Sequence, residues 1–252
     1  MVHDMKQSVA ILAARSTIGQ AVSRRLGEMG AQVALIGREL SGVRVDATRF
    51  SAECDLADFD AVENALDSAR EAMRGLTGIV NCAGSMLLKS AHLTTREEFN
   101  KGIEANLATA FAAVRAAARQ LGDSGGSVVL LSSAAATLGM TNHDLIRAAK
   151  AGVEGLVGSA AATYAGKSIR VNAVAPGLVY SKLSERLLTN RASRKISEAL
   201  HPLTRIGSPD EIASAICWLL HPEQSWVTGQ VIGVDGGLSR VQPRPKIELP
   251  KR

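Results

Sequence analysis

Apolar runs that alternate with amphipathic stretches limit the possible folds of this 252-residue chain more than any other feature. The runs are rich in Val, Ile, Leu and Ala, which is typical of strands that are covered on both faces. Apolar residues at helical spacing lie between them, as at Ile18, Ala21, Val22 and Leu26. We therefore expect an α/β fold with a doubly wound parallel sheet. The expected strands are 8–13, 32–36, 76–81, 127–131, 169–174 and 230–234.

Two segments depart from this alternation. Residues 38–55 leave little room for a strand, a helix and two loops, so we expect the crossover helix there to be short or absent. Residues 241–252 include three prolines and four basic residues, which favours an extended tail. There is no internal repeat and no linker. The chain is therefore predicted to be a single domain over residues 1–240 followed by the tail 241–252.

Composition excludes several classes of function. The net charge is +5, but the basic residues are scattered and form no DNA-binding motif, so nucleic acid is not an expected partner. Three cysteines at unrelated spacings, without a histidine cluster, predict neither a metal site nor a disulfide framework. No apolar run is long enough for a membrane span, and residues 1–7 do not form a signal peptide. We expect a cytoplasmic protein that acts on small molecules.

Several short motifs follow one another in a fixed order. Ser133 and Lys150 have the spacing of Ser followed by Tyr-x-x-x-Lys, and Asn106 lies in Glu-Ala-Asn-Leu. The turn Asn81-Cys82-Ala83-Gly84, the pair Pro176-Gly177 and the segment Val234-Asp235-Gly236-Gly237 complete the set. In this order the chain resembles the short-chain dehydrogenase/reductase family over residues 8–238. That resemblance implies a Rossmann-type fold and a nicotinamide cofactor.

The resemblance also implies roles for the matched residues. Ser133 would hydrogen-bond the substrate carbonyl, Lys150 would bind the nicotinamide ribose, and Asn106 would hold a water of the proton relay. Asp55 would hold the adenine ring. The remaining cofactor contacts would come from Asn81, Ala83, Gly84, Pro176 and Gly177.

Ile146 occupies the position of the family's tyrosine and has no group that could donate a proton. Losing a general acid slows a reaction by roughly 10²–10⁴-fold. His143 is a candidate substitute, because residues three apart share a helix face and histidine is an acid near neutral pH. Asn142 would cap that helix. A surface histidine in a loop is the alternative, and Tyr180 is a weaker candidate.

The phosphate loop departs from the family pattern as well. Where the family has Thr-Gly-x-x-x-Gly-x-Gly, this chain has Ala13 and Thr17 in place of the first two glycines and retains only Gly19. Glycine allows the backbone to approach a pyrophosphate closely, so Thr17 predicts weak or lost binding. Alternatively, the Thr17 hydroxyl donates a hydrogen bond and the loop, with Arg15 and Ile18, still works.

Arg38 indicates which cofactor would bind. It follows the second predicted strand and Gly37, where a protein that prefers NAD would have an acid. A basic residue there suits a 2′-phosphate, so any cofactor should be NADP(H). A solvated loop arginine is the alternative.

A substrate lid is expected at about 178–207, and four basic residues within 185–203 make it positive. They could meet the phosphates of a CoA or acyl-carrier substrate, or they could form a solvated helix face. These residues are Arg186, Arg191, Arg194 and Lys195.

Two main interpretations remain. The first is a non-catalytic or impaired subunit that forms a homo-oligomer (dimer or tetramer), or a hetero-oligomer with an active relative, through helices at about 99–121 and 150–165. The second is an NADP(H)-dependent oxidoreductase acting on alcohol or carbonyl groups with a substitute proton donor. A nucleotide-sensing regulator is a third.

Overall fold

A computed structural model describes residues 7–43 and 46–243. Its seven strands are all parallel and form one sheet in the order β3-β2-β1-β4-β5-β6-β7. The strands are β1 (Ser8–Leu12), β2 (Gln32–Gly37), β3 (Thr48–Glu53), β4 (Gly78–Asn81), β5 (Gly126–Leu131), β6 (Ile169–Pro176) and β7 (Val231–Val234). The predicted doubly wound parallel sheet is confirmed.

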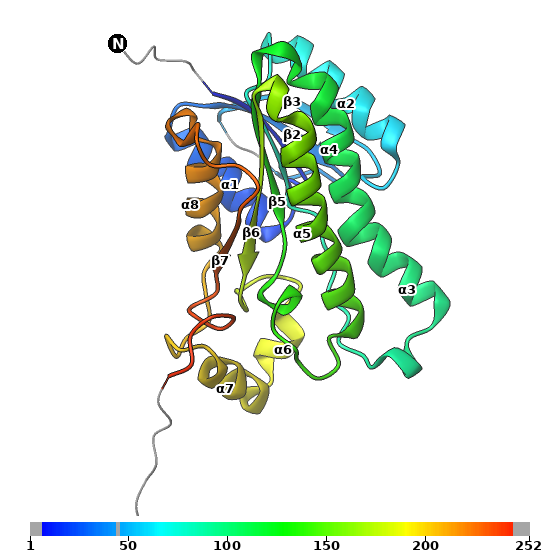
Figure 1. The fold of residues 1–252 in the computed structure, drawn as a ribbon, viewed down its shortest axis with the longest axis vertical. Helices are drawn as coiled ribbons and strands as arrows, with labels where there is room; N and C mark the ends of the chain where they lie inside the picture. The colour runs from blue at the N-terminus through cyan, green and yellow to red at the C-terminus, as the bar shows by residue number, and fades with distance from the viewer. Residues whose placement is uncertain (1–6, 44–45, 244–252) are drawn as a thin grey trace, which may run out of the picture.

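Helices cover both faces of this sheet (Figure 1). On one face lie α1 (Thr17–Glu28) and α8 (Pro209–Leu220), and on the other α2 (Phe59–Met73), α4 (Thr109–Gln120) and α5 (Asp144–Tyr164). Residues alternate between two apolar cores, so Val9 and Ile11 of β1 pack on the first side and Ala10 and Leu12 on the second. Short 3₁₀ turns lie at Ala91–Leu93, Gly122–Ser124, Ala134–Ala136, Ala165–Lys167 and Pro222–Gln224.

Capping side chains fix where the two helices of the first face begin. The Ser16 hydroxyl accepts a hydrogen bond from the Gly19 backbone N–H at 3.0 Å and so caps α1. At α8 the Ser208 hydroxyl accepts from the Glu211 N–H, and the Glu211 carboxylate accepts from the Ser208 N–H. This capping box, with Pro209 as the first helical residue, explains why the helix begins where the sequence suggests.

The segment 38–55 contains a strand, β3, that was not predicted from the sequence. Strand β3 pairs with β2 at the edge of the sheet, and its residues alternate between half-buried and exposed. Its sequence is too polar to be distinguished from the loop residues around it. No helix lies between β2 and β3 in the residues that the structure describes there, as predicted.

The helix expected at 99–121 is not regular. It comprises α3 (Arg96–Ile103), one π-helical turn (Glu104–Ala108) and α4. A π turn inserts an extra residue into the helical ladder and is often found at functional sites. The predicted cap at Asn142 is wrong: α5 begins at Asp144 and His143 takes the cap position, while Asn142 has a positive φ of 62°.

The lid segment contains two short helices beyond the carboxyl end of β6, α6 (Glu185–Thr189) and α7 (Arg191–Leu200) (Figure 1). The strand order reverses between β1 and β4, and at such a switch point the diverging loops leave a crevice for ligands. Among the described residues, no helix is long and apolar enough to cross a membrane. Most of the predicted tail, residues 244–252, lies outside the described residues.

Candidate active site

Ser133, His143 and Ile146 line one pocket of 290 Å³ at the carboxyl end of β5. Ile146 is buried, with 7% of its surface exposed, and so supplies apolar wall where the family has a phenol. The neighbouring Ser132 donates its hydroxyl hydrogen to Glu154 at 2.7 Å. Ser133 instead accepts a hydrogen bond from the Ala135 N–H at 3.2 Å, which leaves its own hydroxyl hydrogen free to donate into the pocket.

Lys150 lies one helical turn beyond Ile146 on α5 and is almost entirely buried. Its Nζ donates a hydrogen bond to the carbonyl oxygen of Leu131 at 2.7 Å. Burial disfavours the charged amine and lowers the pKa of Lys150 to about 8. A methyl group added at Gly84 would lie 3.5 Å from Nζ, so the lysine and the turn after β4 are close neighbours.

Asn106 lies in the π turn and is fully engaged. Its Nδ2 donates to the Gly102 carbonyl oxygen at 2.9 Å and to the Ser85 hydroxyl at 3.0 Å, and its Oδ1 accepts from the Ser85 N–H at 3.2 Å. Ser85 was not predicted as a site residue, although it directly follows the Asn81–Gly84 motif. These bonds tie the turn after β4 to the π turn.

His143 faces the pocket from the start of α5. Its Nδ1 lies 2.8 Å from the Thr141 carbonyl oxygen. The Nδ1–H therefore donates to that carbonyl, and Nε2 lacks a proton in the neutral ring. Only the doubly protonated imidazolium could act as an acid through Nε2. Tyr180 does not line this pocket: it is exposed, with the Arg194 guanidinium 5.8 Å from its ring.

The phosphate loop retains a glycine-like shape. Ala13 has a φ of 56°, the left-handed conformation that favours glycine. At Gly19 a β-carbon would lie 2.6 Å from the Ala13 carbonyl oxygen, so this glycine is required. Thr17 is the first residue of α1, next to half-buried Ile18, and its hydroxyl accepts a hydrogen bond from the Lys182 N–H at 3.4 Å. The threonine thus contacts the loop that leads into the lid.

An acidic residue that sequence reasoning missed lies beside the adenosine end of the site. Glu39, two residues after Gly37, forms an ion pair with Arg15 of the phosphate loop. Arg38 is exposed. Asp55 is exposed too, and its carboxylate accepts from the Ala57 N–H at 3.0 Å. The Glu39 carboxylate therefore offsets part of the positive charge that Arg15 and Arg38 bring to the adenosine end of the site.

The turns after β4 and β6 pack closely against their neighbours in the site. Asn81 is buried, and its side chain accepts from the Ala83 N–H at 3.0 Å and donates to the Thr109 hydroxyl at 3.3 Å. Pro176 ends β6 and Gly177 follows it. A β-carbon at Gly177 would lie 2.7 Å from Nε2 of His201, so no larger residue fits there.

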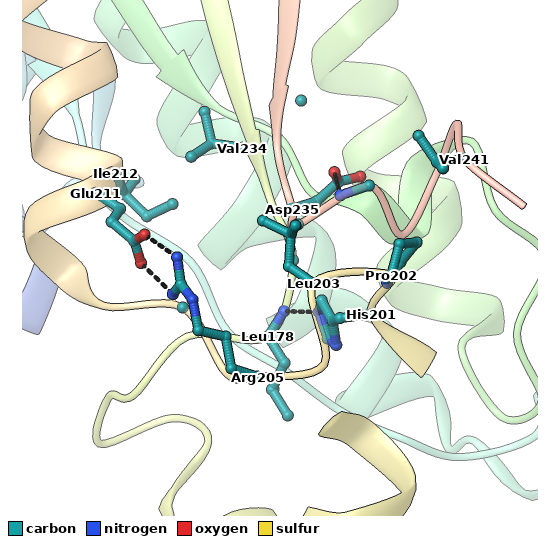
Figure 2. A pocket seen from close by; sticks show the side chains of 15 residues that line it. Leu178, His201, Pro202, Leu203, Arg205, Glu211, Ile212, Val234, Asp235 and Val241 are labelled. Atoms are coloured by element: carbon teal, nitrogen blue, oxygen red, sulfur yellow. Dashed lines mark hydrogen bonds and ion pairs between the residues drawn. The ribbon is translucent and has the colours of Figure 1, made fainter. Parts of the chain in front are cut away.

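His201 fastens the lid to this turn. The ring is buried, with Nδ1 2.6 Å from the Ser197 carbonyl oxygen of α7 and Nε2 accepting from the Leu178 N–H at 3.1 Å. Figure 2 shows the hydrogen bond between the ring and Leu178. His201 lines both the pocket and a second cavity of 470 Å³. With both nitrogens bonded, His201 is a structural histidine.

The two faces of α7 differ in character. On one side of the helix Arg194 pairs with Glu198 at 2.8 Å. Ile196 and Leu200 line the pocket, yet 62% and 55% of their surfaces are exposed. The predicted basic residues Arg186, Arg191, Arg194 and Lys195 are all exposed.

The nicotinamide end of a cofactor fits the residues of this site better than its pyrophosphate does. Lys150, the turn at Asn81–Gly84 and the Pro176–Gly177 turn converge at the carboxyl edge of the sheet, as the ribose and nicotinamide would require. The glycine-like backbone at Ala13 fits the pyrophosphate, whereas the Thr17 side chain narrows the approach. No cluster of three or more potential metal ligands is found among the described residues.

The order of the seven parallel strands, with its reversal between β1 and β4, defines a Rossmann-type α/β protein. A family profile described as enoyl-(acyl carrier protein) reductase matches residues 12–239. The chain belongs to the short-chain dehydrogenase/reductase family, an oxidoreductase family whose members usually bind a nicotinamide cofactor.

Relatives within this family have different activities. The "Inactive 2-(S)-hydroxypropyl-CoM dehydrogenase 2" of Xanthobacter autotrophicus is 34% identical over 230 residues, covering 87% of this chain and 100% of that protein. The 3-oxoacyl-(acyl-carrier-protein) reductase MabA of Mycobacterium tuberculosis is 31% identical, covering 93% of each. The ligand-free aldohexose dehydrogenase of Thermoplasma acidophilum superposes with a TM-score of 0.87 at 26% identity, covering 96% of this chain and 98% of that one.

Proposed function

We propose that this protein is a non-catalytic or strongly impaired member of its family, retained as a subunit of a homo- or hetero-oligomer. The buried Ile146 supports this proposal most directly, because it fills the proton donor's place with an apolar side chain. Without a general acid the barrier to carbonyl reduction rises by about 3–5.5 kcal/mol. A relative described as inactive fits the same proposal.

Weak cofactor binding is the second part of the proposal. The Thr17 side chain at the start of α1 acts against the pyrophosphate, although the backbone at Ala13 keeps the glycine-like shape of the loop. We expect NAD(P)H binding to be weak or undetectable at micromolar concentrations, with NADPH preferred if Arg38 contacts the 2′-phosphate. Calorimetry on the purified protein measures this directly. A sub-micromolar dissociation constant for NADH would contradict both expectations.

Reconstruction of the active site tests the proposal as a whole. Ile146→Tyr would place a phenol beside Ser133 and Lys150. Thr17→Gly with Ala13→Gly would restore the two missing glycines of the phosphate loop. Because the defects act at successive steps, the triple variant should reduce a promiscuous carbonyl substrate faster than the product of the separate gains. Ile146→Phe in the same background is the matched control, since it adds the ring without the hydroxyl. Equal rates for the Tyr and Phe variants would refute the assignment of Ile146.

A working NADP(H)-dependent reductase is the second candidate, and the position of His143 in the same pocket as Ser133 favours it. Its acid would be the imidazolium, which would donate a proton from Nε2 to the substrate carbonyl oxygen. Substantial turnover of a carbonyl substrate by the parent, lost in His143→Ala, would establish this candidate and overturn the first. The basic lid would then suit a CoA or acyl-carrier substrate.

The proposed location is the cytoplasm. The three cysteines are free, two of them buried, which suits a reducing compartment.

A further inference from the structure

The pocket beside Ile146 has an apolar lining that limits what it can bind. Most of its lining is Met, Leu, Ile, Ala and Pro, and none of the described lining residues is Asp, Glu, Lys or Arg. Ala134, Ala135 and Ile146 form a buried wall. A ligand with several hydroxyl groups would lose its hydrogen bonds to water here without replacing them, which costs about 1–3 kcal/mol for each group.

Few polar groups of this pocket are free to meet a ligand. Both ring nitrogens of His201 are bonded to the backbone, and the Ser197 hydroxyl donates to the Ser193 carbonyl oxygen at 2.9 Å. Three side-chain groups of the lining have no hydrogen-bond partner among the described residues: the Ser133 hydroxyl hydrogen, Nε2 of His143 and the Ser193 hydroxyl on α7. The Ser133 donor lies next to the buried apolar wall, and this arrangement matches a single carbonyl oxygen attached to a hydrocarbon chain.

The lid supplies a place for that chain. Ile196 and Leu200 line the pocket from α7 but remain more than half exposed, unlike the buried wall opposite. A chain lying between α7 and the wall would remove these side chains from water. The hydrophobic effect therefore favours an aliphatic occupant over a polar one of the same size.

We propose that this pocket binds medium-chain aliphatic carbonyl compounds, with the carbonyl oxygen at Ser133 and the hydrocarbon chain under Ile196 and Leu200. The inference concerns the substrate pocket of the proposed function, but it does not require that catalysis has been lost. Binding follows from the lining alone and should occur with or without hydride transfer.

The dependence of affinity on the length of the ligand's hydrocarbon chain tests this proposal. The probes are 2-octanone, 2-butanone and hydroxyacetone, measured by ligand-observed NMR titration with and without NADPH. Each buried methylene strengthens binding by roughly fourfold. The four extra methylenes of 2-octanone should therefore lower its dissociation constant by up to roughly 250-fold relative to 2-butanone. Hydroxyacetone should bind no better than 2-butanone.

Substitutions on α7 test whether the ligand's hydrocarbon chain lies against Ile196 and Leu200. Ile196→Asp and Leu200→Asp should each remove most of the chain-length dependence, and because both side chains are exposed the fold should tolerate the change. Ala192→Asp is the matched control, since Ala192 is exposed on the same helix and does not line the pocket. Circular dichroism checks the fold of all three variants.

The outcomes separate this inference from the proposed function. Dissociation constants that do not depend on chain length, binding unaffected by Ile196→Asp and Leu200→Asp, or no binding of 2-octanone with or without NADPH would overturn the inference. Oxidation of NADPH by the parent protein with any of the three probes would instead overturn the non-catalytic function. The affinities and the rates are read from the same samples, so each claim can fail alone.

Discussion

Lys150 is a buried amine with no acidic partner, and its contribution to stability depends on pH. Its pKa is about 8 in the folded protein against an ordinary value of 10.5, because burial disfavours the charge. Between these two values the unfolded chain binds more protons than the folded protein. The free energy of unfolding therefore rises with pH across this window, and the destabilisation is fully present below pH 8.

The expected result is a pH-dependent difference between the parent and Lys150→Met. Relative to the Met variant, the parent should gain up to about 3 kcal/mol of stability between pH 8 and pH 10.5, from 1.36 kcal/mol for each unit of pKa shift. Urea denaturation of both proteins at several pH values measures it, and the difference cancels groups common to both. A difference that is constant over this range would mean that folding does not lower the pKa of Lys150.

Glu39 should weaken any preference for a 2′-phosphate. It pairs with Arg15, so a 2′-phosphate must compete with the carboxylate and meets its negative charge. We expect Glu39→Gln to improve binding of 2′,5′-ADP by roughly two- to fivefold, the range for an exposed ion pair, and to leave 5′-AMP unchanged. Calorimetric titration of both nucleotides tests this, with the exposed Glu28→Gln as control. An equal gain in affinity for both nucleotides would mean that Glu39 acts through the net charge of the site and not on the 2′-phosphate.

Among the structural elements, those with strong periodicity were predictable. Five of the six expected strands and helices α1 and α8 have buried apolar residues, and the structure contains all six strands and both helices with ends shifted by a few residues. Strand β3 was missed because at the sheet edge only alternate residues are half-buried, and its sequence Thr-Arg-Phe-Ser-Ala-Glu resembles a loop.

The site was predictable only where a motif specified it. Ser133, Ile146 and His143 were expected together and share one pocket. The Arg15–Glu39 pair and the Ser85–Asn106 bonds were not foreseen, because each depends on how two loops meet in space. The π turn at Asn106 was also missed, since a helix with one extra residue in a turn has almost the same apolar pattern as a regular helix.

His201 should control the mobility of α7. Its two backbone hydrogen bonds join the carboxyl end of that helix to the turn after β6, and α7 has no buried residue of its own. His201→Ala should lower the free energy of unfolding by about 1–3 kcal/mol, because a buried N–H is left without its acceptor. Amide hydrogen exchange should accelerate most within residues 178–200.

The exposed His92 provides the control for this prediction, because His92→Ala removes an imidazole from a surface turn. Faster exchange spread evenly over the sheet in His201→Ala would indicate global destabilisation and not release of the lid.

At the scale of the whole molecule, α4 and α5 form an outer surface with small residues and one prominent aromatic ring. Phe111 of α4 is 49% exposed and stacks on Phe59 with ring centroids 5.7 Å apart. A surface of this kind suits close packing against a second copy or an active relative. We expect a dimer or tetramer, and Phe111→Glu should weaken association at least tenfold by placing a charge at the contact.

Sedimentation velocity at micromolar concentration distinguishes the assemblies. Met29→Glu is the control, because Met29 is similarly exposed but follows α1 on the opposite face of the sheet. A parent that sediments as a monomer, both alone and with candidate relatives, would contradict the expected assembly.

The left-handed backbone at Ala13 makes the loss of its glycine easy to reverse. Restoring glycine would relieve roughly 1 kcal/mol of strain in the folded loop. It would also give the unfolded chain more freedom, worth about 0.4–1 kcal/mol in the opposite direction. These effects nearly cancel, so selection for stability neither retains the alanine nor opposes the glycine. Evolutionary drift can therefore pass through this position in either direction without changing the shape of the loop.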